Sequence, residues 1–276
     1  MSTGAPLRLL CPEYRLPGDS IAEKWEHAAR MGYDGIELAG PAQSIHDRFP
    51  QLKRLVAGGA LLPTVSSGGR PFIGERDPQS KRSAVSNLKL LLSAIAELGG
   101  VGVTTPACFG LYSRAIPALN PGDDPAERQA LIDALGEVGQ HASAEGVVLL
   151  LEPLNRYEDH HINRLEQALE LIRATGTDSV KLLADVFHMN MEEADLAEAI
   201  RRAGPEIHHV QLADSNRLEP GAGHLDFASV FRALQQIGYE RYCALECRLS
   251  DDARTVLPRV SKHLREVWRS AAGGAA

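Results

Sequence analysis

Short apolar segments recur along the chain, and each is followed by a stretch in which apolar residues have helical spacing. Eight such segments lie at residues 7–11, 34–40, 62–67, 101–107, 147–153, 180–186, 208–214 and 242–248. Continuous apolar runs of this length are typical of parallel strands, because crossover helices cover both faces of a parallel sheet. The pattern therefore predicts eight buried strands joined by helices.

The clearest helical segments lie at residues 20–32, 80–100, 125–146, 164–176, 195–204 and 227–238, and several end at glycine, as helices commonly do. Eight strand–helix units in 276 residues predict an α/β fold, a (β/α)8 TIM barrel in which residues 1–276 form a single domain. The competing fold is a doubly wound open sheet. That fold normally carries a G-x-G-x-x-G turn after its first strand, and residues 11–19, CPEYRLPGD, contain none.

Composition narrows the classes of partner. The formal net charge is -7 and no block of Lys or Arg occurs, which argues against a nucleic-acid surface and favours a small-molecule ligand. None of the four cysteines forms a C-x-x-C pair, so we expect them to be reduced and buried. The chain has neither a secretory N-terminus nor an apolar run near the roughly 18 residues of a membrane span, and a cytoplasmic location without membrane contact is expected.

Oxygen-bearing side chains stand at the ends of four consecutive predicted strands: Glu152, Asp185, Gln211 and Glu246. In a TIM barrel the C-terminal strand ends meet at one mouth, so these side chains are expected to converge. Three carboxylates in one apolar pocket repel each other unless a positive charge lies among them. A divalent cation supplies that charge, and oxygen donors favour Mn²⁺ or Mg²⁺ over zinc. The alternative is that each acid caps a helix or forms a surface ion pair.

A long segment without periodicity, residues 108–125, follows the fourth predicted strand. It would lie at the C-terminal mouth of the barrel. A loop of this length in a compact domain is more often a lid or binding loop than a linker.

Four runs of residues carry a family resemblance: LEPLNRYED at 151–159, DVFHMNMEEADLAEAI at 185–200, DSNR at 214–217 and GHLDF at 223–227. They resemble the sugar isomerase and epimerase branch of the xylose-isomerase-like TIM barrels, and most closely the ketose 3-epimerases that act on D-tagatose and D-psicose. In that family a Glu, an Asp, a His and a Glu hold one divalent metal, Mn²⁺ or Mg²⁺ and sometimes Co²⁺. The resemblance implies that Glu152, Asp185 and Glu246 are metal ligands here.

The chain departs from the family pattern at one ligand, because Gln211 occupies the His position. An amide oxygen ligates a hard cation without adding charge, so a metal site is still expected. Related hydroxypyruvate isomerases also have Gln at this place. The departure therefore bears on the substrate more than on the metal.

The resemblance also implies three substrate contacts, from Glu158, His188 and Arg217. Taken singly, a histidine such as His188 is more often a satisfied interior residue, and Arg217 is compatible with a solvated loop charge. The family mechanism implies that Glu152 and Glu246 are the catalytic pair: one removes a proton beside the sugar carbonyl and the other returns it to the opposite face, through a cis-enediolate. A homodimer or homotetramer is expected on the same ground.

Several alternative functions are compatible with the sequence, some of which use the same site. A hydroxypyruvate-type or aldose–ketose isomerase, a cyclic-polyol dehydratase and a C-glycoside lyase would use the same metal and bases. Endonuclease-like relatives would need more histidines and a basic groove, against which the acidic net charge counts. A non-catalytic barrel that binds a sugar or a partner subunit is the alternative outside enzymes.

Overall fold

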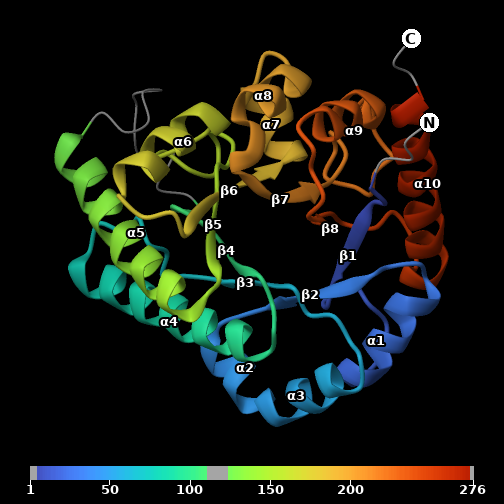
Figure 1. Ribbon diagram of the computed structural model, residues 1–276, viewed down its shortest axis with the longest axis horizontal. Coiled ribbons are helices and arrows are strands. Elements are labelled where there is room, and N and C mark those ends of the chain that lie inside the picture. The colour runs from blue at the N-terminus through green and yellow to red at the C-terminus, as the bar shows by residue number, and fades with distance from the viewer. Residues whose placement is uncertain (1–4, 111–123, 274–276) are drawn as a thin grey trace.

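The computed structural model describes residues 5–110 and 124–273, whose strands close into a parallel barrel (Figure 1). The strands follow chain order, and the first pairs with the last through Leu9 and Cys243. They are β1 (Arg8–Pro12), β2 (Gly35–Ala39), β3 (Thr64–Ser66), β4 (Gly102–Pro106), β5 (Val148–Glu152), β6 (Val180–Asp185), β7 (Ile207–Leu212) and β8 (Tyr242–Leu245). Closure confirms the TIM-barrel prediction and rules out the open sheet.

Helices surround the barrel in the order that the alternating pattern predicts (Figure 1). The helices are α1 (Ile21–Arg30), α2 (Ala42–Asp47), α3 (Phe49–Ala57), α4 (Pro78–Glu97), α5 (Pro125–Glu145), α6 (Leu165–Ala174), α7 (Val186–Glu192), α8 (Leu196–Ala203), α9 (Phe227–Gln236) and α10 (Ala253–Gly273), with the 3-10 turn η2 (Gly204–Glu206) after α8. The apolar pattern does not single out α2, α3, α7 or α10. Of these, α7 begins directly after β6, so it adjoins the predicted site.

Local chemistry sets where the helices begin and end. Ser20 and Glu23 form a capping box at α1, and the Asp77 and Asp124 side chains accept backbone N–H bonds at the starts of α4 and α5. Each such cap satisfies N–H groups that have no partner inside the helix. Gly146 ends α5 with φ 72°, a left-handed conformation that glycine adopts without strain.

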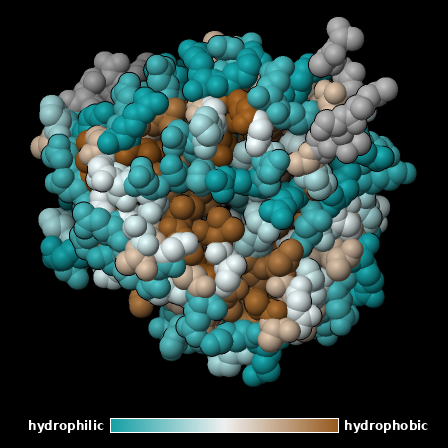
Figure 2. All heavy atoms as spheres, viewed as in Figure 1, coloured by the Kyte–Doolittle hydropathy of each residue, from teal (hydrophilic) through white to brown (hydrophobic). Residues whose placement is uncertain are grey.

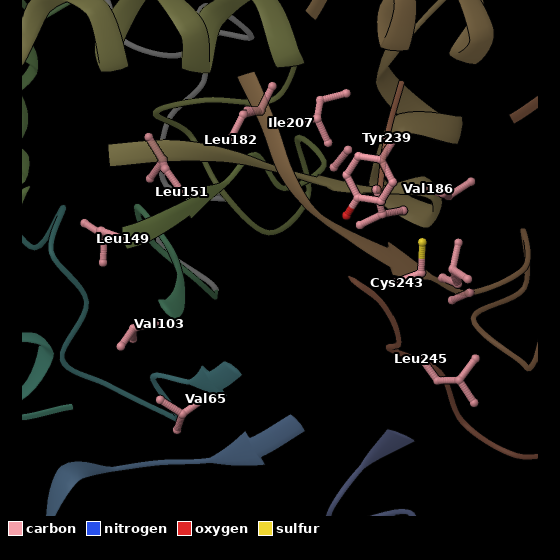
Figure 3. Packing of buried hydrophobic residues seen from close by; sticks show 14 of the residues in the cluster. Val65, Val103, Leu149, Leu151, Leu182, Val186, Ile207, Tyr239, Cys243 and Leu245 are labelled. Atoms are coloured by element: carbon pink, nitrogen blue, oxygen red, sulfur yellow. The ribbon is translucent and has the colours of Figure 1, made fainter. Parts of the chain in front are cut away.

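The apolar core lies between the strands and the helices (Figure 3). Successive residues of a strand point to opposite faces. On β5, Leu149 and Leu151 belong to this outer core, so Leu150 and Glu152 point into the barrel. The same alternation on β6, β7 and β8 turns these residues inward: Leu183, Asp185, His209, Gln211, Ala244 and Glu246.

The barrel mouth therefore receives polar side chains while the outer faces of the same strands stay apolar. On the face shown in Figure 2, hydrophobic residues gather toward the middle and hydrophilic residues form the edge.

Most of the 108–125 segment, residues 111–123, lies outside the described residues, so its role stays a prediction. Among the helices of the described ranges, none is long and apolar enough to cross a membrane.

Two neighbours on α4 test the outer core. Leu91 is 0% exposed and Leu90 is 63% exposed. We expect Leu91→Ala to lower the free energy of unfolding by about 2–5 kcal/mol, because it leaves a cavity against the strands. Leu90→Ala should change it by no more than about 0.5 kcal/mol. Urea denaturation of both variants measures the difference, and equal losses would contradict this account of the core.

Candidate functional site

Four oxygen-bearing side chains meet at the C-terminal mouth of the barrel. Glu152 ends β5 and Asp185 ends β6, and Asp185 pairs in register with Gln211 on β7. Glu246 follows β8 directly, and its backbone N–H donates to Leu212 O at 3.0 Å. Glu152, Asp185 and Gln211 are buried, and Glu246 is partly exposed. The structure thus brings the four residues predicted from the strand ends to one place.

His188, on α7, lies among the carboxylates. Its Nε2 is 3.5 Å from Asp185 Oδ2, 3.6 Å from Glu152 Oε1 and 3.8 Å from Glu158 Oε2. Asp185 also begins α7, since its Oδ1 accepts the backbone N–H of Phe187 at 2.8 Å. Asp185 therefore joins the end of β6 to the start of α7, which places His188 beside the strand-end carboxylates. Glu158, in the segment after β5, lies next to the same ring.

Asn155 decides which nitrogen of His188 carries the proton. The backbone N–H of Asn155 donates to His188 Nδ1 at 3.1 Å, so Nδ1 must hold a lone pair and Nε2 the hydrogen. The Asn155 side-chain amide also lies 2.8 Å from Nδ1. Burial lowers the pKa of His188 to about 4, so the ring is neutral near pH 7.

This tautomer limits what His188 can do. Its Nε2 is close enough to Glu152 and Asp185 for the three to be a possible metal cluster. A neutral ring with Nδ1 accepting a hydrogen bond has no lone pair left on Nε2. His188 is therefore a hydrogen-bond donor aimed at the site, and the atoms left there with free lone pairs are carboxylate and amide oxygens.

Arg217 supplies the positive charge of the site. Its Nη1 is 2.6 Å from Asp185 Oδ2 and its Nη2 is 3.6 Å from Glu246 Oε1, while the guanidinium lies over the Phe187 ring at 4.5 Å. Burial opposes its charge, but Asp185 and Glu246 outweigh that effect and raise the pKa of Arg217. Arg217 has φ 60°, so the loop that carries it accepts a conformation that is uncommon outside glycine.

One guanidinium does not neutralise three carboxylates. Burial, with repulsion from Asp185 and Glu246, raises the pKa of Glu152 well above its usual value. Burial also raises the pKa of Glu246 to about 7, although Arg217 works in the other direction. Both shifts reflect burial first, and repulsion between the carboxylates adds to it.

Gln211 carries a buried oxygen atom, Oε1, that has no hydrogen-bond partner among the described residues. Its amide nitrogen lies 3.5 Å from Glu246 Oε2. A buried carbonyl oxygen without a partner costs free energy. A cation held by Glu152, Asp185, Gln211 and Glu246 would satisfy this oxygen and the excess negative charge together, so the residues present fit a divalent metal.

Asp214, at the start of the glycine-rich loop after β7, organises that loop. Its carboxylate accepts backbone N–H bonds from Ser215 at 2.8 Å, Gly221 at 2.8 Å and Leu225 at 3.1 Å. A Cβ on Gly223 would lie 2.2 Å from Asp214 Oδ1, so only glycine fits there. The polar chemistry of this loop is thus partly structural, because it holds the chain in the shape that presents Arg217.

Two contributors to the site were not predicted from the sequence. Tyr14, after β1, donates its hydroxyl to Glu246 Oε2 at 3.1 Å, although 232 residues separate them. Asn155 acts on His188 through its own backbone. Both roles depend on loops from distant parts of the chain meeting at the mouth.

A second polar layer lies deeper in the barrel. Glu37 on β2 accepts the Thr64 hydroxyl at 2.6 Å, and its Oε2 is 2.9 Å from His209 Nε2. All three residues are buried. This layer lies one inward position below Gln211 on β7, and so supports the floor of the site.

Comparison with known proteins places the chain in a family. Residues 25–268 match the family model of the xylose isomerase-like TIM barrel. The chain belongs to this family. Its similarity to curated enzymes covers most of the chain: it is 33% identical to a 3-dehydro-D-guloside 4-epimerase of Escherichia coli K12, over 84% of this chain and 88% of that enzyme. It is 34% identical to an L-ribulose 3-epimerase of Mesorhizobium japonicum, over 86% of this chain and 78% of that enzyme.

Solved structures of sugar epimerases share the fold. An L-ribulose 3-epimerase superimposes with a TM-score of 0.85 at 27% identity, covering 98% of this chain and 97% of that one. The apo form of a 3-keto-D-glucoside 4-epimerase from E. coli gives a TM-score of 0.84 at 28% identity, covering 97% and 99%. The family resemblance seen in the sequence is thus confirmed. Within the xylose isomerase-like TIM barrels, the chain is similar to the sugar epimerases.

The charge on Asp214 provides a test of the loop. Although burial opposes it, the backbone hydrogen bonds from Leu225, Ser215 and Gly221 hold the pKa of Asp214 below its usual value. A carboxyl whose folded pKa lies below its unfolded pKa contributes its full stability above the unfolded value of about 3.9. That contribution is lost as the pH falls through the folded pKa.

We expect Asp214→Asn to lower the free energy of unfolding by about 1–3 kcal/mol at pH 7, because an amide group would face backbone donors. The difference in the free energy of unfolding between the variant and the native protein should become smaller as the pH falls below about 4. Urea denaturation across that pH range measures it, with Asp178→Asn, at an exposed position, as the control. A gap that stays constant down to pH 2 would contradict the assigned role.

Proposed function

We propose that the protein is a divalent-metal-dependent epimerase that inverts a carbon beside the carbonyl of a sugar, and most specifically a ketose 3-epimerase. The observation that carries this proposal is the pair of carboxylates Glu152 and Glu246, both with raised pKa values, which approach one pocket from the ends of β5 and β8 with β6 and β7 between them. Such a placement suits an acid and a base on opposite faces of one carbon.

The reaction requires a base and a means of holding negative charge. A proton beside a carbonyl is weakly acidic, and its removal leaves a cis-enediolate whose charge lies on oxygen. A bound Mn²⁺, Mg²⁺ or Co²⁺ would supply Lewis-acid stabilisation of that charge. We assign Glu152, Asp185, Gln211 and Glu246 as the residues that would hold the ion, because their oxygens form the donor set and hard cations prefer oxygen.

The protein's own groups perform the proton transfers. Glu152 or Glu246 accepts the proton from one face of the carbon, and the other returns a proton to the opposite face, which inverts the centre. His188 donates its Nε2–H to a sugar oxygen, as its tautomer requires. Arg217 binds a second oxygen by charge, and Glu158 accepts a substrate hydroxyl.

A second candidate shares this chemistry at a different carbon. The E. coli relative at 33% identity is named a 3-dehydro-D-guloside 4-epimerase. In a ketose, the carbonyl group at carbon 2 acidifies the proton at carbon 3. In a 3-keto-glycoside, the carbonyl group at carbon 3 acidifies the proton at carbon 4 in the same way. A panel that contains both free ketoses and 3-keto-glycosides separates the two candidates.

Glutamine variants test the catalytic pair. Glu152→Gln and Glu246→Gln should each lower kcat by at least about 100-fold, because each removes one proton-transfer group. Exchange of the substrate C–H for deuterium from D2O, followed by NMR, reports proton removal separately from inversion. Glu240→Gln, at an exposed position, is the control. Near-native exchange and turnover in either site variant would refute the assignment.

Metal removal and Gln211 variants test the ligand set. Chelation should abolish activity, and Mn²⁺ or Mg²⁺ should restore it. Gln211→Leu should weaken metal affinity by at least about 10-fold, because one oxygen donor is lost, whereas Gln211→His should retain a metal and shift its preference toward zinc. Isothermal titration of the stripped protein measures both, and unchanged affinity in Gln211→Leu would remove Gln211 from the site.

The quaternary structure is a further part of the proposal. We propose a homodimer or homotetramer and one domain over residues 1–276, on the family resemblance and the chain length. Sedimentation velocity and limited proteolysis measure the two properties.

A further inference from the structure

A second cluster of metal-binding side chains lies apart from the carboxylates. Cys108 is in the segment after β4, and His160 and His161 are in the segment after β5. One ligand atom from each residue lies within 4.8 Å of the other two. All four cysteines of the chain are reduced, so the Cys108 sulfur is a thiol. None of these three residues has a part in the proposed epimerase chemistry.

His160 has the environment of a ligand without its ion. Its side chain is 9% exposed, and both ring nitrogens are buried without a hydrogen-bond partner among the described residues. A buried imidazole normally satisfies at least one nitrogen, since leaving both without partners costs free energy. This ring faces His161 with centroids 4.0 Å apart.

His161 is prepared for the same role by its neighbours. Its Nε2 is 3.1 Å from the Gly74 carbonyl oxygen, which can only accept, so Nε2 carries the hydrogen and Nδ1 the lone pair. A backbone carbonyl that fixes the tautomer in this way is the usual outer partner of a metal-binding histidine. A Cβ on Gly74 would lie 2.8 Å from the His161 ring, so glycine is required for the ring to lie there.

Asp159 joins the two segments. Its carboxylate accepts the backbone N–H of Cys108 at 3.0 Å and that of His161 at 2.7 Å. The backbones of Cys108 and His161 are therefore held close to each other by one side chain and do not depend on an ion to meet. Such preorganisation lowers the entropic cost of binding.

We propose that Cys108, His160 and His161 form a second metal site, which takes a borderline cation such as Zn²⁺. One sulfur and two nitrogens match the ligands that zinc recruits, whereas Mn²⁺ and Mg²⁺ prefer the oxygen donors at the barrel mouth. On binding, the thiol releases its proton to solvent and acts as a thiolate.

The charges around the cluster are compatible with a cation. Glu127 Oε2 is 4.0 Å from His160 Nε2 and also pairs with Arg76. Glu127 thus balances the arginine charge and offers a carboxylate beside the cluster.

Occupancy of this site would act on the neighbouring segments. Glu158 lies two residues before His160, and its carbonyl oxygen accepts the backbone N–H of Gly110 at 2.9 Å. A metal bridging Cys108 and His160 would hold these two segments together. The site is separate from the proposed catalytic one, and its existence does not depend on that function.

Cobalt distinguishes the two sites. Co²⁺ bound to a thiolate gives a sulfur-to-metal charge-transfer absorption in the near ultraviolet, and Co²⁺ bound to oxygen donors does not. We expect titration of the untagged, metal-stripped full chain with Co²⁺ to produce this band with a stoichiometry of one per chain, and Zn²⁺ to remove it. A native protein that saturates with Co²⁺ and never develops the band would overturn the proposal, whatever the fate of the epimerase assay.

Two matched pairs of variants localise the band. Cys108→Ala should abolish it and weaken Zn²⁺ binding at this site by at least about 100-fold, whereas Cys243→Ala, at another buried cysteine, should retain it. His160→Asn should shift and weaken the band, and His46→Asn, at an exposed position, should not. A band that survives in Cys108→Ala would assign the thiolate elsewhere and refute the site.

Discussion

The mouth of this barrel is dominated by negative charge that the fold itself concentrates. β5 and β6 each end in a carboxylate and Glu246 directly follows β8, and the inward alternation of the strands points all three at one space. Taking each charge out of water costs roughly several kcal/mol unless it is compensated. Arg217 compensates one of them closely, through Asp185. Burial, with repulsion between the acids, still raises the pKa values of Glu152 and Glu246, although Arg217 acts in the opposite direction.

Two loops at the barrel mouth place hydrogen-bond donors beside these carboxylates. The loop after β7 is held by the Asp214 carboxylate, so that Arg217 reaches back over the strand ends. The segment after β5 presents a backbone N–H to His188, which turns the protonated nitrogen of the ring toward the acids. Neither device adds a negative charge to the pocket. The site thus surrounds the acids with hydrogen-bond donors and one arginine, while Gln211 Oε1 has no hydrogen-bond partner among the described residues.

Two different ligand chemistries occur at the same end of the molecule. The strand ends offer oxygens only, which suits a hard ion engaged in carbonyl chemistry. The segments after β4 and β5 offer a thiol and two imidazoles, which suit zinc. The difference in donors would let each site select its own ion from a mixture. It also allows one spectroscopic probe to report on the two sites separately.

Much of the fold and the main cluster followed from the order of residues alone. A strand reverses the direction of its side chains at every residue, so the apolar runs located the strands, and their last polar residues located Glu152, Asp185, Gln211 and Glu246. That inference needs only neighbours in sequence. The TIM barrel followed in the same way from the repeating period, whereas α2, with 6 residues, has too few turns to give a clear period.

The remaining features depend on segments that are far apart in the chain. Tyr14 reaches Glu246 across 232 residues, and the tautomer of His188 is set by a backbone N–H 33 residues away. Cys108 lies close to His160 and His161 because β4 and β5, which precede these residues, are adjacent strands of the barrel. Sequence by itself determined which residues end each strand and which way they point. Tertiary structure alone decided what those residues touch, because hydrogen bonds and ion pairs between loops depend on distances that no local pattern encodes.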